Sequence, residues 1–449
     1  FDRTVHKGDL TGIEIINRLA EQVWTRKIGR LEEHRAVEII KNRSGDSIAG
    51  VLFIDMRTGK YVLVRAKAVL LATGGGPTMY KYHTPSGDKS CDGLAMALRA
   101  GLPLRDMEMV QFHPTGLLAG THTRMTGTVL EEGLRGAGGY LLNGAKERFM
   151  QQYDPKAERA TRDVVSRAMY TEMRKGKTTP HGGLYISMAH LGPEKVRRDF
   201  KGMVERCADC GFDLAGGLVE VVPTAHYMMG GVEFHSDCST DLPGLFVAGE
   251  DAGGVHGANR LGGNGVANST VFGALAGDAM ARWVQSADFK EPDTAAIDAA
   301  ISAQEQPFAR ADRGSLEPLR ERLYDVMWDK VGIIRDAGGL AEGARELAAL
   351  ETALDAHGLA DHNRAFNLAW HDWMNLKSLV AASRAITAAA MAREDSRGAH
   401  FRSDFPEPGP LETSAFTSIR FRDNRYSVES KPVRFTRVRP GQTLLRNVA

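Results

Sequence analysis

The sequence predicts an α/β protein that contains a parallel sheet and continues into a helical carboxy-terminal region. Residues 66–76 and 244–251 are apolar runs without alternation, and each run ends in glycines or acidic residues. Such runs are typical of strands that are buried on both faces of a parallel sheet. About 140 residues separate the two runs, which is long enough for an inserted domain. After residue 288, apolar side chains recur with the period of helices.

The amino-terminal elements surround the first of these runs. Apolar residues recur at helical spacing over residues 9–24, which predicts an amphipathic helix. Three strand-like runs follow at residues 36–40, 48–55 and 60–66, and residues 57–59 supply hairpin chemistry between the last two. We interpret these three runs as a small β-meander with a packing role.

The second buried run precedes a glycine-dense segment. Within it, the small residues of 268–280 predict a helix that packs tightly on a sheet. Two buried strands that each end in a glycine loop are expected where a dinucleotide lies across the carboxyl ends of a sheet. Farther along, residues 318–330, 340–357 and 364–393 predict a helical bundle, and short strand-like runs follow residue 397.

Composition excludes several classes of function. The chain has 449 residues, which predicts two or three domains, and its net charge of +1 gives no general attraction to nucleic acid. Four cysteines are too few for a disulfide framework and predict a reducing, cytoplasmic compartment. No apolar run approaches the roughly 18–20 residues of a membrane span, so we expect no direct span. A single CxxC pair, Cys207 and Cys210, is interpreted as packing, and no metal site is assigned.

Eight sequence blocks carry a family resemblance. They are ATGGG (72–76), DMEMVQFHPTG (106–116), EEGLRGAGGYLLN (131–143), ERFM (147–150), RDVVSRAM (162–169), HYMMGG (226–231), HGANRLGGN (256–264) and SRGAH (396–400). In this order they resemble the flavoprotein subunit of succinate dehydrogenase and fumarate reductase, and more weakly L-aspartate oxidase. The resemblance implies an FAD-dependent oxidoreductase that acts on a dicarboxylate. It also implies the carboxyl half of a Rossmann-like FAD-binding domain, an inserted α+β capping domain and a carboxy-terminal helical bundle.

The resemblance implies a division into five segments. They are a partial FAD-binding domain (1–92), a capping and substrate domain (93–232), a second FAD-binding segment (233–288), a helical domain (289–396) and a carboxy-terminal region (397–449). Family members open with a strand and a GxGxxG loop, and often carry a histidine that is linked to the flavin. Neither is found in this sequence, so we expect the chain to lack the amino-terminal part of its FAD-binding domain.

The resemblance also implies the contacts of the cofactor. They are Thr73, Gly74, Gly75, Asp92, Glu250, Asn259, Gly263, Asn264 and Val266. Glycines allow backbone amides to approach the flavin and phosphate oxygens, and Glu250 can accept hydrogen bonds from ribitol or ribose hydroxyls. The alternative is that the glycines serve only tight packing of strands against helices.

Binding a small dicarboxylate needs a cationic or donor cluster for each carboxylate. The resemblance implies that His113, His226 and Arg260 bind these carboxylates. It further implies that Arg162 transfers the proton, while hydride passes between the substrate and flavin N5. Glu132 and Arg135 lie three residues apart and would feed protons to Arg162. A lone Arg-Asp pair would otherwise be interpreted as a salt bridge.

Two residues depart from the family pattern. Glu131 stands where the family has a substrate-binding threonine, and Ala137 stands where it has a glutamate. An ionised glutamate cannot donate to a carboxylate, so Glu131 either changes substrate choice or turns outward to pair with Arg124. The main interpretation is a flavoprotein that partners an iron–sulfur subunit on the inner face of the cell membrane. A soluble aspartate-oxidase-type enzyme and a non-catalytic assembly or binding module are the alternatives.

Overall fold

A two-stranded parallel sheet lies at the centre of the computed structural model, which describes residues 7, 11–120, 123 and 125–442. Strand β4 (Val69–Leu71) pairs with β11 (Leu245–Val247) in parallel. The parallel pairing confirms the prediction. The ladder pairs only three residues of each strand, so both strands are shorter than the apolar runs that predicted them. The ladder ends there because Thr73 and Gly74 turn toward the side chain of Asp251 and donate their amides to it.

The predicted meander forms an antiparallel sheet in the order β1-β2-β3. Its strands are β1 (His34–Lys41), β2 (Ile48–Asp55) and β3 (Lys60–Arg65). β1 is longer than predicted because His34 and Arg35 still pair with β2. Gly59 has a φ of 70°, the left-handed conformation that glycine adopts without strain in the turn between β2 and β3. Helix α8 (Thr294–Glu305) packs against β1.

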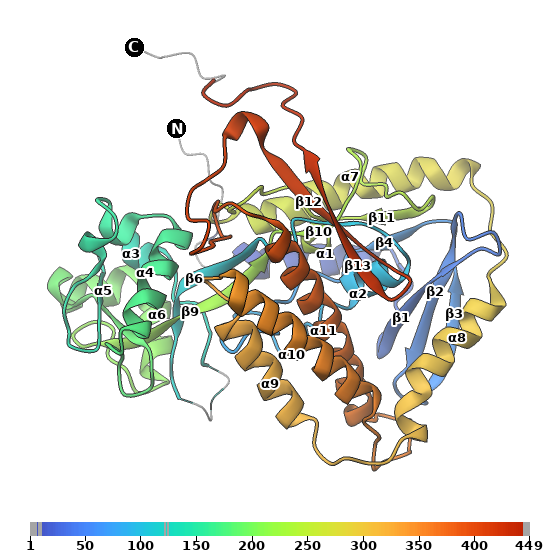
Figure 1. Ribbon diagram of the computed structural model, residues 1–449, viewed down its shortest axis with the longest axis horizontal. Helices are drawn as coiled ribbons and strands as arrows, with labels where there is room; N and C mark the ends of the chain where they lie inside the picture. Colours follow the sequence, from blue (N-terminus) through green and yellow to red (C-terminus); the bar gives the residue numbers. More distant parts are fainter. Residues whose placement is uncertain (1–6, 8–10, 121–122, 124, 443–449) are drawn as a thin grey trace.

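The inserted segment forms the separate unit at the left of Figure 1. Its antiparallel sheet has the order β6-β9-β8-β7. The strands are β6 (Val110–Leu117), β7 (Tyr140–Leu142), β8 (Leu184–Ser187) and β9 (Val219–Met228), and the helices are α3 (Gly133–Gly136), α4 (Arg162–Arg174), α5 (Pro193–Asp199) and α6 (Lys201–Ala208). Every residue of β6 is buried, and α4 packs against this strand. The polar side chains of β6 are therefore held inside the protein.

The carboxy-terminal region contains the predicted helices. They are α9 (Glu317–Asp329), α10 (Ala337–Asp355) and α11 (Leu368–Ala392), and they pack together at the front of Figure 1. α11 begins four residues later than predicted because Asn367 caps it, accepting a hydrogen bond from the amide of Trp370. β12 (Ala415–Arg422) and β13 (Arg425–Pro432) form a hairpin that joins β5 (Leu104–Arg105) and β10 (Gly231–Val232).

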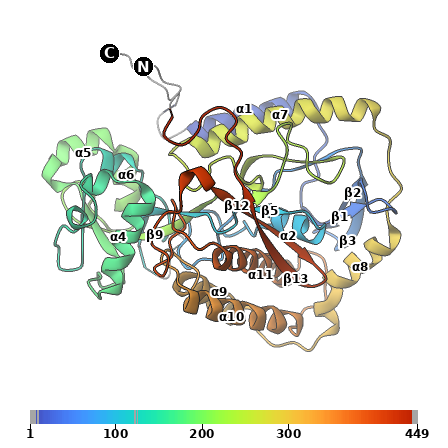
Figure 2. The ribbon, with the colours of Figure 1, turned by 45° about the horizontal axis from the view of Figure 1, so that its top comes forward.

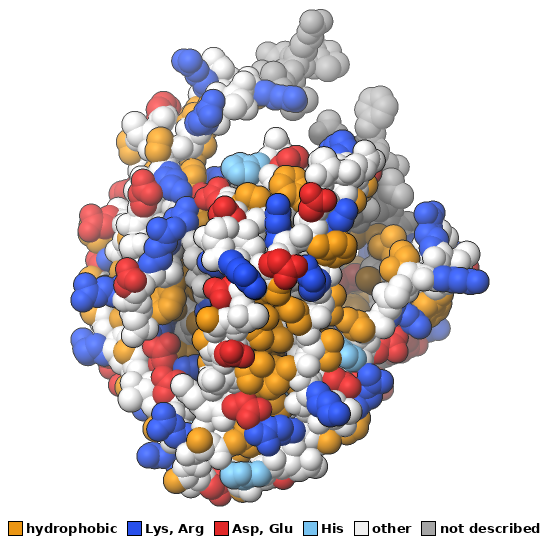
Figure 3. Space-filling model, turned by 90° about the vertical axis from the view of Figure 1, so that its right-hand side faces the viewer, with side chains coloured by type: hydrophobic (Ala, Val, Ile, Leu, Met, Phe, Trp, Pro, Cys, Tyr) orange, Lys and Arg blue, Asp and Glu red, His pale blue; other side chains and the backbone are white. Residues whose placement is uncertain are grey.

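Two helices, α1 (Thr11–Thr25) and α7 (Asn264–Ser286), lie at the top of Figure 2. Both carry exposed apolar side chains. α1 contains no buried residue, and Ile13 and Ile16 are 60% and 66% exposed. α7 starts before the predicted residue 268, and its Val271 is 53% exposed. Residues 9 and 10 of the predicted first helix lie outside the described residues. From the side of β1–β3 and α8, hydrophobic side chains gather in the middle of the face, with charged side chains around them (Figure 3).

Candidate active site

Two arginines contact one carboxylate where the inserted unit meets the segment at residues 256–264, which we call the glycine-rich loop. Arg162 begins α4, and its Nε and Nη2 donate to Oε2 of Glu132 at 3.1 and 2.8 Å. Nη2 of Arg135 donates to the other carboxylate oxygen of Glu132 at 3.2 Å. Burial alone would raise the pKa of Glu132, but the two arginines hold it below its ordinary value. The structure thus brings together the three residues predicted to move the proton.

Gln111, which the sequence analysis did not single out, holds Arg162 from the other side. Its Oε1 accepts from Nη1 of Arg162 at 3.1 Å, and its Nε2 donates to Oδ1 of Asn259 at 2.9 Å and to the carbonyl of Arg260 at 2.7 Å. Nδ2 of Asn259 donates to Oδ1 of Asp163 at 2.8 Å. Asn259 was predicted to contact the cofactor, but its side-chain amide is part of this network.

The three predicted carboxylate-binding residues lie together. The rings of His113 and His226 are 5.4 Å apart, and Nη2 of Arg260 lies 3.0 Å from Nε2 of His226. Because arginine only donates, Nε2 of His226 accepts and its proton resides on Nδ1, which contacts the Thr84 hydroxyl at 2.9 Å. Burial, with the nearby arginines, lowers the pKa of His226 to about 3 and that of His113 well below its usual range. Both imidazoles are neutral near pH 7.

Arg260 is fixed by an aromatic ring and by close backbone packing. Its guanidinium carbon lies 4.5 Å from the ring centroid of Tyr227, a cation–π contact. A Cβ added to Gly262 would lie 3.1 Å from Oε2 of Glu132 and 3.4 Å from Nη2 of Arg162. The loop therefore approaches the proton-transfer residues at a position where a side chain would crowd them.

The glycine-rich loop is supported from outside by the carboxy-terminal segment. The amide of Ala399 donates to the carbonyl of Ala258 at 2.9 Å, and the carbonyl of Gly398 accepts from Nη1 of Arg167 at 3.1 Å. His400 is fully buried, and its Nδ1 lies 2.8 Å from Nη1 of Arg335. The SRGAH block therefore fixes the loop that carries Asn259 and Arg260.

The predicted cofactor loop lies directly on two carboxylates. A Cβ added to Gly75 would lie 2.4 Å from Cδ of Glu250, so only glycine fits there. Glu250 also accepts a hydrogen bond from the amide of Met228 at 2.8 Å. Burial raises the pKa of Glu250 to about 7. Asp251, which the sequence analysis did not assign, contacts Thr73 and Gly74 in the same loop.

The amino terminus of α7 supplies the remaining predicted contacts. Gly263 is the N-cap residue with a φ of 79°, and its lack of a side chain leaves the first turn without side-chain capping. Asn264 and Val266 lie in this first turn, whose N–H groups are suited to an anionic or carbonyl-rich ligand. Oδ1 of Asn268, farther along α7, is buried without a hydrogen-bond partner among the described residues. A helix amino terminus, an unpartnered acceptor and a loop with close backbone packing fit a flavin, although the amides of Asn264 and Val266 already donate to the carbonyls of Leu261 and Gly263.

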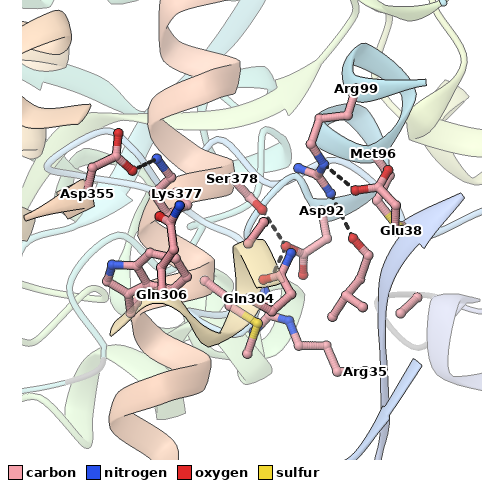
Figure 4. A pocket seen from close by; sticks show the side chains of 15 residues that line it. Arg35, Glu38, Asp92, Met96, Arg99, Gln304, Gln306, Asp355, Lys377 and Ser378 are labelled. Atoms are coloured by element: carbon pink, nitrogen blue, oxygen red, sulfur yellow. Dashed lines mark hydrogen bonds and ion pairs between the residues drawn. The ribbon is translucent and has the colours of Figure 1, made fainter. Parts of the chain in front are cut away.

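Asp92 is the predicted cofactor contact whose side chain points elsewhere. Its carboxylate pairs with Arg35 at 2.9 Å and accepts from the hydroxyl of Ser378 at 2.8 Å. These groups line a cavity of about 260 Å³ between β1, α2 (Asp92–Arg99) and α11 (Figure 4). The neighbouring Gly93 still touches the cofactor loop, since a Cβ there would lie 2.3 Å from Oγ1 of Thr73. A contact between Asp92 and FAD stays a prediction.

Glu131 and the two cysteines of the CxxC pair contribute no assigned chemistry. Glu131 is half-buried, and its proposed outward partner Arg124 lies outside the described residues, so its orientation stays a prediction. Cys207 is buried on α6, and burial raises the pKa of its thiol to about 12. Burial also raises the pKa of the Cys210 thiol. Both thiols are protonated near neutral pH, in keeping with a packing role.

Comparison with known proteins identifies the fold of this site. A model of the FAD binding domain matches residues 2–266, and a model of the fumarate reductase flavoprotein carboxy-terminal domain matches residues 320–444. The fumarate reductase flavoprotein of Mycobacterium tuberculosis is 34% identical over 464 residues, which cover 98% of this chain and 78% of that protein. The chain belongs to the fumarate reductase and succinate dehydrogenase flavoprotein family. It is an oxidoreductase whose cofactor is FAD.

Solved flavoproteins of this family have the same fold. The quinol fumarate reductase flavoprotein of Escherichia coli matches with a TM-score of 0.89 and 31% identity, over 98% of this chain and 78% of that chain. Sdh1 of Mycobacterium smegmatis matches with a TM-score of 0.85 and 33% identity, over 97% and 75%. Among the helices that the structure describes, none is long and apolar enough to cross a membrane.

Proposed function

We propose that this flavoprotein interconverts succinate and fumarate, or a closely related dicarboxylate, with Arg162 as the proton-transfer residue. The observation that carries the proposal is the hydrogen-bonded series Arg162, Glu132 and Arg135 beside the cluster of His113, His226 and Arg260. When bound, FAD supplies the hydride acceptor for oxidation or the hydride donor for reduction at N5. The loop at residues 73–75, Glu250 and the first turn of α7 are the groups that would hold it.

The substrate cluster suits a dianion. Arg260 and Arg162 supply permanent positive charge, and neutral His226 orients Arg260 through its Nε2 while its Nδ1 proton is directed to the Thr84 hydroxyl. Nε2 of His113 and Nε of Arg260 are buried without partners among the described residues, so they are free to bind a ligand. Because these groups are fixed before the substrate arrives, little reorganisation is needed in the transition state.

Proton transfer uses the chain's own side chains. Arg162 is held by three hydrogen bonds to Glu132 and Gln111, which fix the direction of its guanidinium. In the reducing direction Arg162 donates a proton to the substrate carbon. Glu132, which is ionised at rest, then takes a proton from Arg135 and passes it to Arg162, and Arg135 regains its proton from solvent. Arg135 keeps Glu132 ionised and oriented between these transfers. Although an arginine has a high pKa, positioning against the reacting carbon makes the transfer effective.

The same interpretation extends to partners. Relatives include the 8-methylmenaquinol:fumarate reductase flavoprotein subunit of Wolinella succinogenes, which is 35% identical over 414 residues. The protein would exchange electrons with an iron–sulfur protein, and this contact would hold it at the inner face of the cell membrane. Copurification with an iron–sulfur protein from membranes, tested at low and high salt, checks this association.

A second candidate is an aspartate-oxidase-type activity. It is favoured by Glu131, which replaces the substrate-binding threonine of the family pattern. An ionised carboxylate near the substrate would repel a plain dicarboxylate and suit a substrate with an amine or hydroxyl at that end. The two candidate activities differ in the substrate that exchanges electrons with the flavin, which is succinate or fumarate in the first and aspartate in the second.

The test is a steady-state comparison on FAD-loaded protein. We expect fumarate reduction by a reduced dye and succinate oxidation by an oxidised dye, each at least tenfold more efficient in kcat/KM than the reaction of aspartate. A preference for aspartate with oxygen as acceptor would select the second candidate. No turnover of any of these compounds by protein that retains FAD would overturn both.

A further inference from the structure

Asp251 is a buried carboxylate that forms no ion pair with any residue the structure describes. It ends the short helical turn Gly249–Asp251 after β11, and its side chain is completely buried. Asp106, Glu108, Glu158, Glu172 and Glu220 are also buried, and each contacts an Arg, Lys or His. Asp251 has no such contact in the described part of the chain. Burial of an unpaired carboxylate is costly, so an ordinary packing role does not explain this residue.

Its hydrogen bonds all lead to the cofactor loop. Oδ2 of Asp251 accepts from the amide of Thr73 and, at 3.1 Å, from the amide of Gly74. The hydroxyl of Thr73 lies 3.1 Å from Oδ1. A Cβ added to Gly93 would lie 2.7 Å from Oδ1, so α2 closes the other side. The side chain therefore ties the carboxyl end of β4 to that of β11.

Glu250, the other carboxylate that supports the loop, precedes Asp251 in the chain. At the amino terminus of α2, Asp92 is paired with Arg35, and the thiol of Cys91 is neutral because burial raises its pKa well above its usual range. The cation that faces the loop is Lys89, whose Nζ lies 3.5 Å from the carbonyl of Thr73. Burial raises the pKa of Asp251 to about 7, although the hydrogen bonds from Thr73 and Gly74 oppose this. Above pH 7 the carboxylates of Glu250 and Asp251 therefore carry more negative charge than Lys89 can balance.

We propose that Asp251 is a positioning residue for FAD, which fixes the loop at residues 73–75 and, when ionised, makes reduction of the bound flavin less favourable. The inference rests on the proposed function, because it concerns the flavin site of that reaction. Reduction adds electrons to the isoalloxazine, and a buried negative charge nearby opposes this addition. A flavin with a lower potential is the stronger reductant, so Asp251 favours transfer of hydride from flavin to substrate.

The test uses a substitution that removes only the charge. In Asp251→Asn, the amide oxygen can take the place of Oδ2 and accept from both backbone amides, while the amide NH₂ donates to the Thr73 hydroxyl. The flavin potential of the holoenzyme is measured by spectroelectrochemistry between pH 6 and pH 8.5, without substrate. At pH 8 we expect the equilibrium of Asp251→Asn to shift at least tenfold toward reduced flavin, about 30 mV for a two-electron couple. The shift should shrink below pH 7, where wild-type Asp251 is protonated.

Glu172→Gln is the matched control, because Glu172 is a buried acid of the inserted unit that pairs with Lys175. It should leave the potential unchanged. If Asp251→Asn does not hold FAD, Asp251→Ser supplies a second neutral acceptor. Loss of FAD from both folded variants supports the positioning role. Retained FAD with an unchanged potential, or an equal shift in Glu172→Gln, overturns the proposal. Since no substrate is present, a missing succinate or fumarate activity overturns the proposed function alone.

Discussion

The substrate side of the site is rich in arginine, whereas the flavin side is rich in buried carboxylates. On the proposed substrate side, Arg162 and Arg260 would supply positive charge to a dicarboxylate, and Glu132 is the carboxylate that Arg162 contacts. On the flavin side, Glu250 and Asp251 support the loop and are hydrogen-bonded mainly by backbone amides. One site therefore holds two environments of opposite charge.

This difference in charge suits the two sides of the site to two different ligands. A dianionic substrate gains from fixed guanidinium groups in a site with little water. On the proposal made for Asp251, the flavin would meet groups that resist added negative charge, and electrons would be directed toward the substrate. The loop that carries Gly262 approaches Glu132 and Arg162 closely, and a Cβ at Gly262 would crowd both side chains. Variants on each side should consequently change different observables.

The largest effect is expected on the arginine side. Arg162→Gln should lower kcat by about 10²- to 10⁴-fold, because it removes the proton-transfer group. Flavin content and melting temperature should stay nearly unchanged, as no group on the flavin side is altered. Steady-state kinetics, a flavin absorbance spectrum and a thermal melt check these outcomes. Parallel loss of folding and activity would instead support a structural salt bridge with Glu132.

Gln111→Leu should have the next largest effect. The change keeps the side-chain volume but leaves Arg162 and the carbonyl of Arg260 without their partner. A small displacement of Arg162 should lower kcat by roughly 10²-fold with a smaller change in KM. Gln304→Leu, at the cavity between β1 and α11, is the control and should behave like wild type. A change in KM alone would show that Gln111 acts on substrate binding and not on Arg162.

Glu131→Thr tests whether the carboxylate of Glu131 weakens substrate binding on the arginine-rich side. If Glu131 faces the substrate, the threonine should lower KM for succinate about tenfold, because a repelling carboxylate becomes a donor. Malate and aspartate should gain less. The comparison is a set of KM values for the three compounds in both proteins. A wild type that already uses succinate efficiently, with no change in the variant, would show that Glu131 does not select the substrate.

The smallest effect concerns His226 and acid pH. Its pKa is lowered to about 3 in the folded protein, so it stays neutral while the unfolded chain binds a proton below about pH 6.5. Its stabilising contribution is therefore complete above pH 6.5 and is lost as the pH falls toward 3. His226→Gln cannot titrate, so the melting temperature of wild type should fall by a few degrees more between pH 7 and pH 5 than that of the variant. Parallel melting curves would contradict the buried neutral imidazole.

The sequence predicted the residues that lie in motifs and missed those defined by distant contacts. Arg162 and Glu132 were found from their blocks, and the structure joins them although 30 residues separate them. Gln111 stands inside a quoted block, but its contact with Arg162 spans 51 residues and leaves no periodic signal. Asp251 follows Glu250 in the sequence, yet only the pairing of β4 with β11 shows what it binds. Burial and ion pairing of a single carboxylate depend on tertiary packing, which local patterns do not encode.

Prediction of the elements was limited in the same way. The apolar run at residues 66–76 correctly indicated a parallel strand, but Val69 and Leu70 are only half-buried and the strand ends at Leu71. The remaining residues of the run form the cofactor loop because Asp251 accepts hydrogen bonds from the amides of Thr73 and Gly74. Asp92 lies in a segment with a family match, whereas its pairing with Arg35 depends on where β1 and α11 meet.

The contacts that the SRGAH block makes with the glycine-rich loop are expected to form late in the synthesis of the chain. The amide of Ala399 donates to the carbonyl of Ala258. Nη1 of Arg335 donates to Nδ1 of His400 and to the carbonyl of Glu108, near the start of β6. These contacts join segments that leave the ribosome far apart in time, and such long-range contacts form late in folding. A nascent chain that ends before residue 396 lacks β12 and β13, and it also lacks the hydrogen bond from Ala399 to the carbonyl of Ala258. We therefore expect the glycine-rich loop to reach its final position only after residue 400 has been synthesised.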